Sequence, residues 1–233
     1  MKEKEMGKEM NRILTFDCYG TLLDTSPARL AIEQIADRHG LDPKESFALY
    51  EKCENEQMYE HDFRPFDALT PEVLRSMDSE LGVDVFEKNV DLLWNAYANF
   101  QPFEDVLPVL EQLKADGWRL IVLSNTCPQL MERHLKALNG LIDKTLIASQ
   151  THCYKPVLSF FEQAEEKFSL DKACHIHIAA GYWWDILPSK KMNWDAIWVS
   201  RRPQDNQLEK EQSVPFVHTF ADLCGRIQDI LHA

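Results

Sequence analysis

From residue 101 onward the sequence alternates between short β-prone runs and helix-like stretches. Strands that alternate with helices favour a parallel sheet, because each connection has to return to the same end of the sheet. The pattern therefore predicts an α/β fold, with a Rossmann-like parallel sheet covered by helices on both faces. The predicted strands cover residues 12–17, 119–123, 145–148, 175–180 and 196–200.

The segment between the first two predicted strands has a different pattern. Apolar residues recur there at helical spacing, and no strong strand pattern interrupts them. We therefore expect an all-helical cap domain inserted after the first strand of an α/β core. The predicted units are a polar N-terminal lead-in (1–11), the core (12–24 and 101–233), the cap (25–100), a polar loop (201–213) and a final helix (220–231).

Composition excludes several functional classes. Lys and Arg total 25 against 38 Asp and Glu, and the net charge of −13 would repel nucleic-acid phosphates and anionic membranes. No apolar run approaches the roughly 18 residues of a membrane-spanning helix, and the polar start lacks the apolar segment of a signal peptide. The six cysteines have neither zinc-site nor disulfide-framework spacing. We expect a cytoplasmic protein with free thiols and no nucleic-acid or membrane partner.

Polar side chains follow the predicted strands where each strand ends. Asp17 ends the first strand, and Ser124 and Asn125 end the second. Lys155 and Asp185 follow the next two strands. Ligands of open parallel sheets bind beyond the carboxyl ends of the strands, so we expect these side chains to converge. Two carboxylates and a lysine suit covalent hydrolysis, in which one carboxylate attacks a substrate and the other activates water.

Four short motifs carry a resemblance to a known family. They are FDCYGTLLDTSP around Asp17, LSNT at 123–126, YKP at 154–156 and WD at 184–185. In order and spacing they resemble the four motifs of the haloacid dehalogenase superfamily, and the helical insert after the first motif matches its cap domain. The resemblance spans about residues 12–200.

Two departures from the commonest form of these motifs indicate one branch of the superfamily. Most members are phosphatases with a second Asp two positions after the nucleophile and a Gly-Asp pair that helps to hold Mg²⁺. Here these positions hold Tyr19 and the pair Gly181-Tyr182. The chain is similar instead to the L-2-haloacid dehalogenase branch, which works without a metal. The resemblance implies no metal, no cofactor and a small carboxylate as the substrate.

The resemblance also assigns roles to the residues at the strand ends. Asp17 would displace the halide and form an aspartyl ester, and Asp185 would activate the water that hydrolyses this ester to a 2-hydroxy acid. Lys155 would orient the water, and its charge is expected to lower the pKa of Asp17 and keep it ionised.

Further residues are expected to bind the substrate. The resemblance places Tyr19, Thr21, Ser124 and Asn125 around the substrate carboxylate and the leaving group, with Trp184 as an apolar wall. Where the branch has a Ser and an Asn, this chain has Ala180 and Tyr182. A phenol at 182 that faced the pocket could donate to a small anion, so a fluoroacid substrate is conceivable. For the cap arginine that attracts the halide in this branch, Lys44, Arg38 and Arg64 remain open.

Other functions also remain open. The same ester chemistry could act on another small carbon electrophile, a weak Mg²⁺-dependent phosphatase could retain the fold, and so could a binding protein without activity. His175 and His177 are expected on one face of a strand, as structural residues. Apolar cap residues such as Trp94 and Tyr97 could form the cap core or a homodimer interface.

Overall fold

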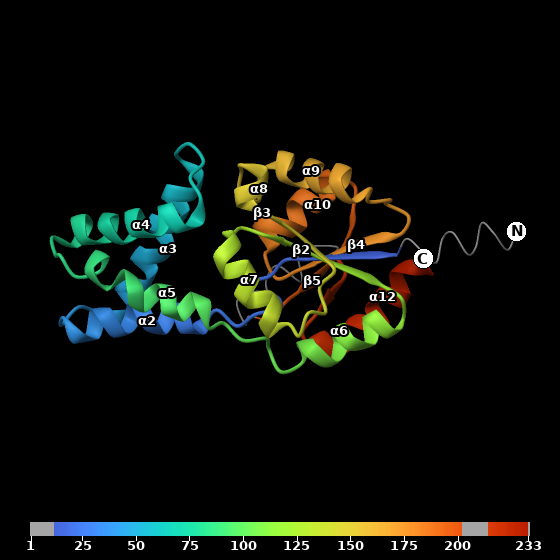
Figure 1. Cartoon of the computed structure of the whole chain (residues 1–233), viewed down its shortest axis with the longest axis horizontal. Coiled ribbons are helices and arrows are strands. Elements are labelled where there is room, and N and C mark those ends of the chain that lie inside the picture. Colours follow the sequence, from blue (N-terminus) through green and yellow to red (C-terminus); the bar gives the residue numbers. More distant parts are fainter. Residues whose placement is uncertain (1–11, 202–213, 233) are drawn as a thin grey trace, which may run out of the picture.

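The computed structural model describes residues 12–201 and 214–232, and its centre is a parallel sheet (Figure 1). The strands lie in the order β3-β2-β1-β4-β5-β6, and all of these pairings are parallel. The strands are β1 (Ile13–Phe16), β2 (Arg119–Ser124), β3 (Lys144–Ile147), β4 (His175–Ala179), β5 (Asp195–Val199) and β6 (Phe216–Val217). Each predicted strand is present within one or two residues of its expected bounds, and β6 is an additional short edge strand.

Helices cover both faces of this sheet, so the predicted α/β fold is confirmed. Alternate strand residues divide between two cores: Leu120 and Val122 pack on one side, and Ile121 and Leu123 pack on the other. Helices α6 (Val106–Ala115), α7 (Pro128–Ala137) and α12 (Leu223–Leu231) cover the first side. Helix α9 (Leu158–Phe168) covers the second, next to α10 (Leu187–Lys191). Shorter helices are α8 (Ala148–Thr151), η2 (Tyr182–Ile186) and η4 (Phe220–Asp222).

The helices between β1 and α6 form a lobe beside the sheet, and we call residues 26–98 the cap (Figure 1). Pro27 lies in the first turn of its first helix, where its missing N–H costs nothing. The carboxylate of Asp42 accepts from the backbone N–H of Glu45 and caps the second helix. The cap contains α2 (Ser26–Arg38), α3 (Pro43–Tyr59), α4 (Phe66–Leu81), η1 (Glu87–Asn89) and α5 (Val90–Ala98).

Two chain segments connect the cap to the sheet, and they pair with each other. The backbone N–H of Asp24 donates to the oxygen of Gln101 at 2.9 Å, and that of Phe103 donates to Leu22 at 3.1 Å. These bonds hold the start and the end of the cap together. Within residues 12–201 and 214–232, no helix is both long enough and apolar enough to cross a membrane. The predicted lead-in lies outside the described residues, as does the predicted polar loop except for its first residue.

Candidate active site

The ammonium group of Lys155 lies between two buried carboxylates at the carboxyl ends of the strands. Its Nζ donates to Oδ1 of Asp17 at 2.8 Å and to Oδ1 of Asp185 at 2.6 Å. A third N–H donates to the backbone oxygen of Leu123 at 2.9 Å, so all three donors are used. The side chains of Lys155 and Asp185 are each 2% exposed. The fold thus joins three residues that the sequence separates by up to 168 positions into one buried, paired cluster.

Thr21 holds the other carboxylate oxygen of Asp17. Its hydroxyl donates to Oδ2 of Asp17 at 2.6 Å and accepts from the backbone N–H of Ala180 at 2.8 Å. Thr21 is fully buried and is not among the residues that line the cavity described below. The expectation that it binds substrate is therefore corrected: it positions the carboxylate and ties it to the loop after β4.

Burial and neighbouring charges change the pKa values of the two carboxyl groups in opposite directions. Burial raises the pKa of Asp17, and the negative charge of Asp185 adds to this. The Lys155 ammonium acts to lower the pKa of Asp17, as expected, but burial is the larger effect, so the net pKa is raised. Burial also acts to raise the pKa of Asp185, but Lys155 and a hydrogen bond from His177 outweigh it and lower that pKa. The two carboxyls are therefore unequal in proton affinity.

His177, which the sequence predicts to be a structural residue, positions Asp185. Its Nε2 lies 3.1 Å from Oδ1 of Asp185, and its Nδ1 lies 2.8 Å from the hydroxyl of Thr15. The same hydroxyl lies 2.7 Å from Nε2 of His175, whose pKa burial lowers to about 3. One assignment of protons satisfies this chain: His175 donates to Thr15, Thr15 to His177, and His177 to Asp185. The alternation of His and Ile along β4 is the sequence signal for it.

Gly181 leaves room for the carboxylate of Asp185. A Cβ atom at position 181 would lie 2.6 Å from Oδ2 of Asp185, closer than real contacts allow. The backbone N–H of Asp185 also donates to the oxygen of Gly181 at 2.9 Å. A side chain at 181 would therefore displace the carboxylate that faces the cavity.

The aromatic run at 182–184 does not form one wall. Tyr182 is buried against Trp198, with ring centroids 5.1 Å apart, and its hydroxyl has no hydrogen-bond partner within the described residues. It does not line the cavity, so its predicted role as a substrate-binding residue is corrected. Trp183 is exposed and lines an adjoining groove. Trp184 lines the cavity, as expected.

Ser124, the last residue of β2, and Asn125, which follows it, make different contacts. Asn125 lines the cavity and clamps the backbone of Lys155: its Nδ2 donates to the oxygen at 2.9 Å, and its Oδ1 accepts from the N–H at 2.7 Å. Tyr59 of the cap also donates to this oxygen, at 3.0 Å. Ser124 is fully buried, does not line the cavity, and its hydroxyl has no hydrogen-bond partner in the described chain. Its expected contact with substrate is therefore corrected.

A cavity of about 330 Å³ opens above Asp17, Lys155 and Asp185. Tyr19 lines it, and its hydroxyl is hydrogen-bonded to Thr126 at 2.6 Å. This volume is at the low end for small-molecule pockets, so it suits a ligand of a few carbon atoms. The cap contributes the opposite wall, which includes Arg29, Phe47, Tyr50, Glu51, Glu54, Met58, Tyr59, Phe66 and Tyr97.

The cation on the cap wall is Arg29, which differs from the three cap cations left open by the sequence. Its guanidinium lies 5.2 Å from the centre of the Phe47 ring, and its Nε donates to Glu33 at 2.7 Å. The three expected candidates, Arg38, Lys44 and Arg64, do not line the cavity.

The residues around Asp17 do not fit a magnesium site. The position that carries a second Asp in phosphatases holds Tyr19, whose hydroxyl is bonded to Thr126. The carboxylates that could ligate a metal are both in contact with the Lys155 ammonium, which supplies the positive charge at this position. Mg²⁺ requires oxygen ligands in near-octahedral geometry, and this set does not offer it.

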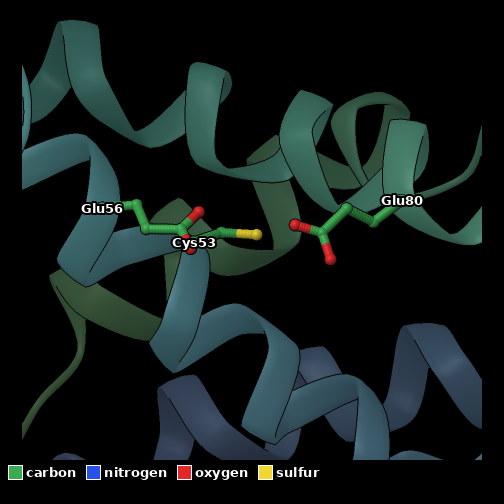
Figure 2. A group of neighbouring side chains, drawn as sticks. All are labelled: Cys53, Glu56 and Glu80. Carbon is green, nitrogen blue, oxygen red and sulfur yellow. The ribbon is translucent and has the colours of Figure 1, made fainter.

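One group of possible metal ligands lies elsewhere in the described part of the chain, in the cap (Figure 2). Cys53 and Glu56 come from α3, and Glu80 comes from α4. The ammonium of Lys52 already lies 2.9 Å from Glu80 and 3.7 Å from Glu56. Burial, with the two nearby carboxylates, raises the pKa of Cys53 to about 11, which keeps the thiol protonated at neutral pH. This group is an ion-paired patch rather than a preformed metal site.

Comparisons with known proteins show which proteins this chain resembles. The model of a family described as haloacid dehalogenase-like hydrolase matches residues 12–193. An (S)-2-haloacid dehalogenase of Pseudomonas sp. (strain YL) is 26% identical over 194 residues, which cover 81% of this chain and 82% of that protein. The sequence resemblance to this branch is thereby confirmed.

Solved structures show the same fold. The L-2-haloacid dehalogenase of Xanthobacter autotrophicus has a TM-score of 0.77 at 18% identity, over 94% of this chain and 99% of that one. A defluorinating L-2-haloacid dehalogenase has a TM-score of 0.72 at 21% identity, over 95% of each chain.

Proposed function

Because the chain belongs to the haloacid dehalogenase-like hydrolases, we propose that it is a metal-independent hydrolase that converts short 2-haloacids to 2-hydroxy acids. The observation that carries this proposal is the Lys155 ammonium held between Asp17 and Asp185 on the floor of a small cavity. The matched relative is an (S)-2-haloacid dehalogenase, which supports a carbon–halide bond as the target. The defluorinating structural neighbour supports the inclusion of fluoroacids in the test.

In the first step, a carboxylate oxygen of Asp17 attacks the carbon that bears the halogen. The new C–O bond forms as the carbon–halide bond breaks, and the halide leaves with the bonding electrons. Thr21 and Lys155 each bond one oxygen of Asp17 and so fix the plane of its carboxylate. Arg29 is the cap cation placed to attract the departing halide.

In the second step, water attacks the carbonyl carbon of the Asp17 ester. Oδ1 of Asp185 is bonded to Lys155 and His177, whereas Oδ2 has no hydrogen bond within the described residues. Oδ2 is therefore the acceptor for the proton of the attacking water. Cleavage of the ester releases the 2-hydroxy acid, regenerates the Asp17 carboxylate and leaves one proton for solvent.

The test is halide release from (S)-2-chloropropionate, bromoacetate and fluoroacetate, with and without EDTA. We expect release that EDTA does not affect and that falls at least about 10³-fold in Asp17→Asn, because the covalent nucleophile is lost. The matched control is Asp24→Asn in the same loop, whose carboxylate bonds Ser26 and does not line the cavity. Release that survives in Asp17→Asn, or no release from any of the three acids, would contradict the proposal.

A further inference from the structure

The cap wall of the cavity combines aromatic rings with carboxylates. Aromatic faces attract cations through the ring quadrupole, and carboxylates attract them by charge and by hydrogen bonding. This combination is the chemistry that recognises an ammonium group. The cap residues that supply it are Tyr50, Glu51, Glu54, Phe66 and Tyr97, whereas the Phe47 ring already contacts the guanidinium of Arg29.

Glu54 is held in place by two phenols of the cap. Its Oε1 accepts from the hydroxyl of Tyr50 at 2.5 Å and from that of Tyr97 at 3.5 Å. The two hydroxyls also contact each other. Oε2 of Glu54 has no hydrogen bond among the residues that the structure describes, so one oxygen of a fixed carboxylate remains available to a ligand.

The environment of Glu54 favours an incoming positive charge. Burial raises the pKa of this carboxyl group, and the charge of the nearby Glu51 adds to the effect. A cation beside it would offset the cost of desolvating the carboxylate and would restore the ionised form.

The charges around the cavity are not balanced. Four carboxylates line it, and two of them share the single ammonium of Lys155. The other cation, Arg29, donates to Glu33, a carboxylate that does not line the cavity. The lining residues therefore leave Glu51 and Glu54 without a cation bonded to them, and a substrate that brings a positive charge would supply one.

We propose that Glu54, assisted by Glu51, forms a subsite for an ammonium group, so that the preferred substrate is a 2-haloacid with an amine at the far end of its chain. The inference rests on the proposed function, because it assigns the cap side of the same cavity. The halogenated carbon then lies at Asp17 and the ammonium lies among the rings of the cap.

Two substrates of equal length test this subsite. In (S)-4-amino-2-chlorobutanoate an ammonium stands where (S)-2-chloropentanoate has a methyl group. We expect kcat/KM for chloride release to be at least about 10-fold higher for the amino compound. Glu54→Gln should remove this preference, whereas Glu56→Gln, the same change on the same helix outside the cavity, should keep it. Glu54→Asp keeps the negative charge and should retain part of the preference for the amino compound. This variant still tests the subsite if Glu54→Gln folds poorly.

A binding measurement separates this inference from the proposed reaction. Butylammonium should bind the wild-type protein in calorimetry and bind Glu54→Gln at least about 10-fold more weakly. Turnover of 2-chloropentanoate without any preference for the amino compound would overturn the subsite and leave the proposed function standing. Glu54-dependent binding of butylammonium with no halide release from any acid would support the subsite and overturn the proposed function.

Discussion

The floor and the cap wall of the cavity use charge in different ways. On the floor, Lys155 donates all its N–H groups, and the cluster is buried. On the cap wall, Arg29 is 51% exposed and Glu54 is only half-buried, with one oxygen unbonded in the described chain. On the floor, the ammonium between two carboxylates fixes the reacting groups in one geometry. On the cap wall, Glu51 and Glu54 have no cation bonded to them within the described residues, so this wall can bind different ligands.

This difference assigns the chemical steps to the floor of the cavity and substrate selectivity to the cap wall. Asp17 directly follows β1, and Lys155 and Asp185 lie on the segments that follow β3 and β4, so all three lie at the same edge of one sheet and are fixed to one another by direct hydrogen bonds. The cap residues come from helices that are joined to the core by two short chain segments and by contacts such as those of Tyr97 with His134 and of Tyr59 with Lys155. Substitutions on the floor should therefore change rate constants, and substitutions on the cap should change affinity and substrate preference.

Among the variants that distinguish ester formation from ester hydrolysis, Asp185→Asn is expected to have the largest effect on the rate. Without this base, the Asp17 ester forms but its hydrolysis slows about 10²- to 10⁴-fold. One equivalent of chloride should be released from (S)-2-chloropropionate in a burst, and mass spectrometry should detect the carboxyethyl adduct on Asp17. The control is Asp195→Asn, an exposed carboxylate at the start of β5. A variant that loses the burst together with turnover would show that Asp185 acts before the ester.

The same variant gives a pH dependence with a definite sign. Asp17 has to be ionised to attack, so ester formation is lost as the pH falls through the raised pKa of Asp17. The charge of Asp185 is one cause of that raised pKa. Removing it should move the acid limb of the burst rate to lower pH, measured by rapid-quench chloride release. A shift to higher pH would contradict this account of the coupled pair.

A smaller effect on the floor is expected for His177→Phe. The ring remains, but Asp185 loses a hydrogen bond and a neighbour that lowers its pKa. Ester hydrolysis should slow about 10-fold, and its acid limb should move to higher pH. Single-turnover kinetics of the trapped ester would measure both.

His175→Phe is the matched control for this change. It removes the other histidine bonded to Thr15 but no contact with Asp185. It should lower the free energy of unfolding without moving the acid limb of ester hydrolysis. If the acid limb of ester hydrolysis shifted equally in the two variants, the hydrogen-bonded histidines would act on Asp185 only through packing.

The floor could be predicted from the sequence more completely than the cap wall. Asp17, Lys155 and Asp185 each follow a strand, and a parallel sheet brings its carboxyl ends together whatever the helices do. Thr21 and Tyr182 were misplaced because a motif position does not say whether a side chain points to the cavity or into the core. His177 was a visible signal, since a polar residue on a buried strand face needs a partner.

The cap wall depends on how helices pack, which periodicity does not determine. The pattern in α2 and α3 shows which residues are buried, but not which part of each helix faces the sheet. Helical periodicity therefore does not distinguish Lys44 from the other cations of the cap. Arg29 and Glu54 become cavity residues only through the orientation of the cap, so the sequence alone could not single them out.

The smallest expected effect tests this assignment of the cap cation. Arg29→Gln should raise KM for (S)-2-chloropropionate about 2- to 5-fold, since a half-exposed charge contributes little in water. This increase in KM should be smaller at high salt, because ions screen an exposed charge. Lys44→Gln, at an exposed position at the start of α3, should leave KM unchanged at every salt concentration. If Lys44→Gln raised KM and Arg29→Gln did not, the cap would have to sit differently over the floor, and the assignment of Glu54 to the cavity would fail with it.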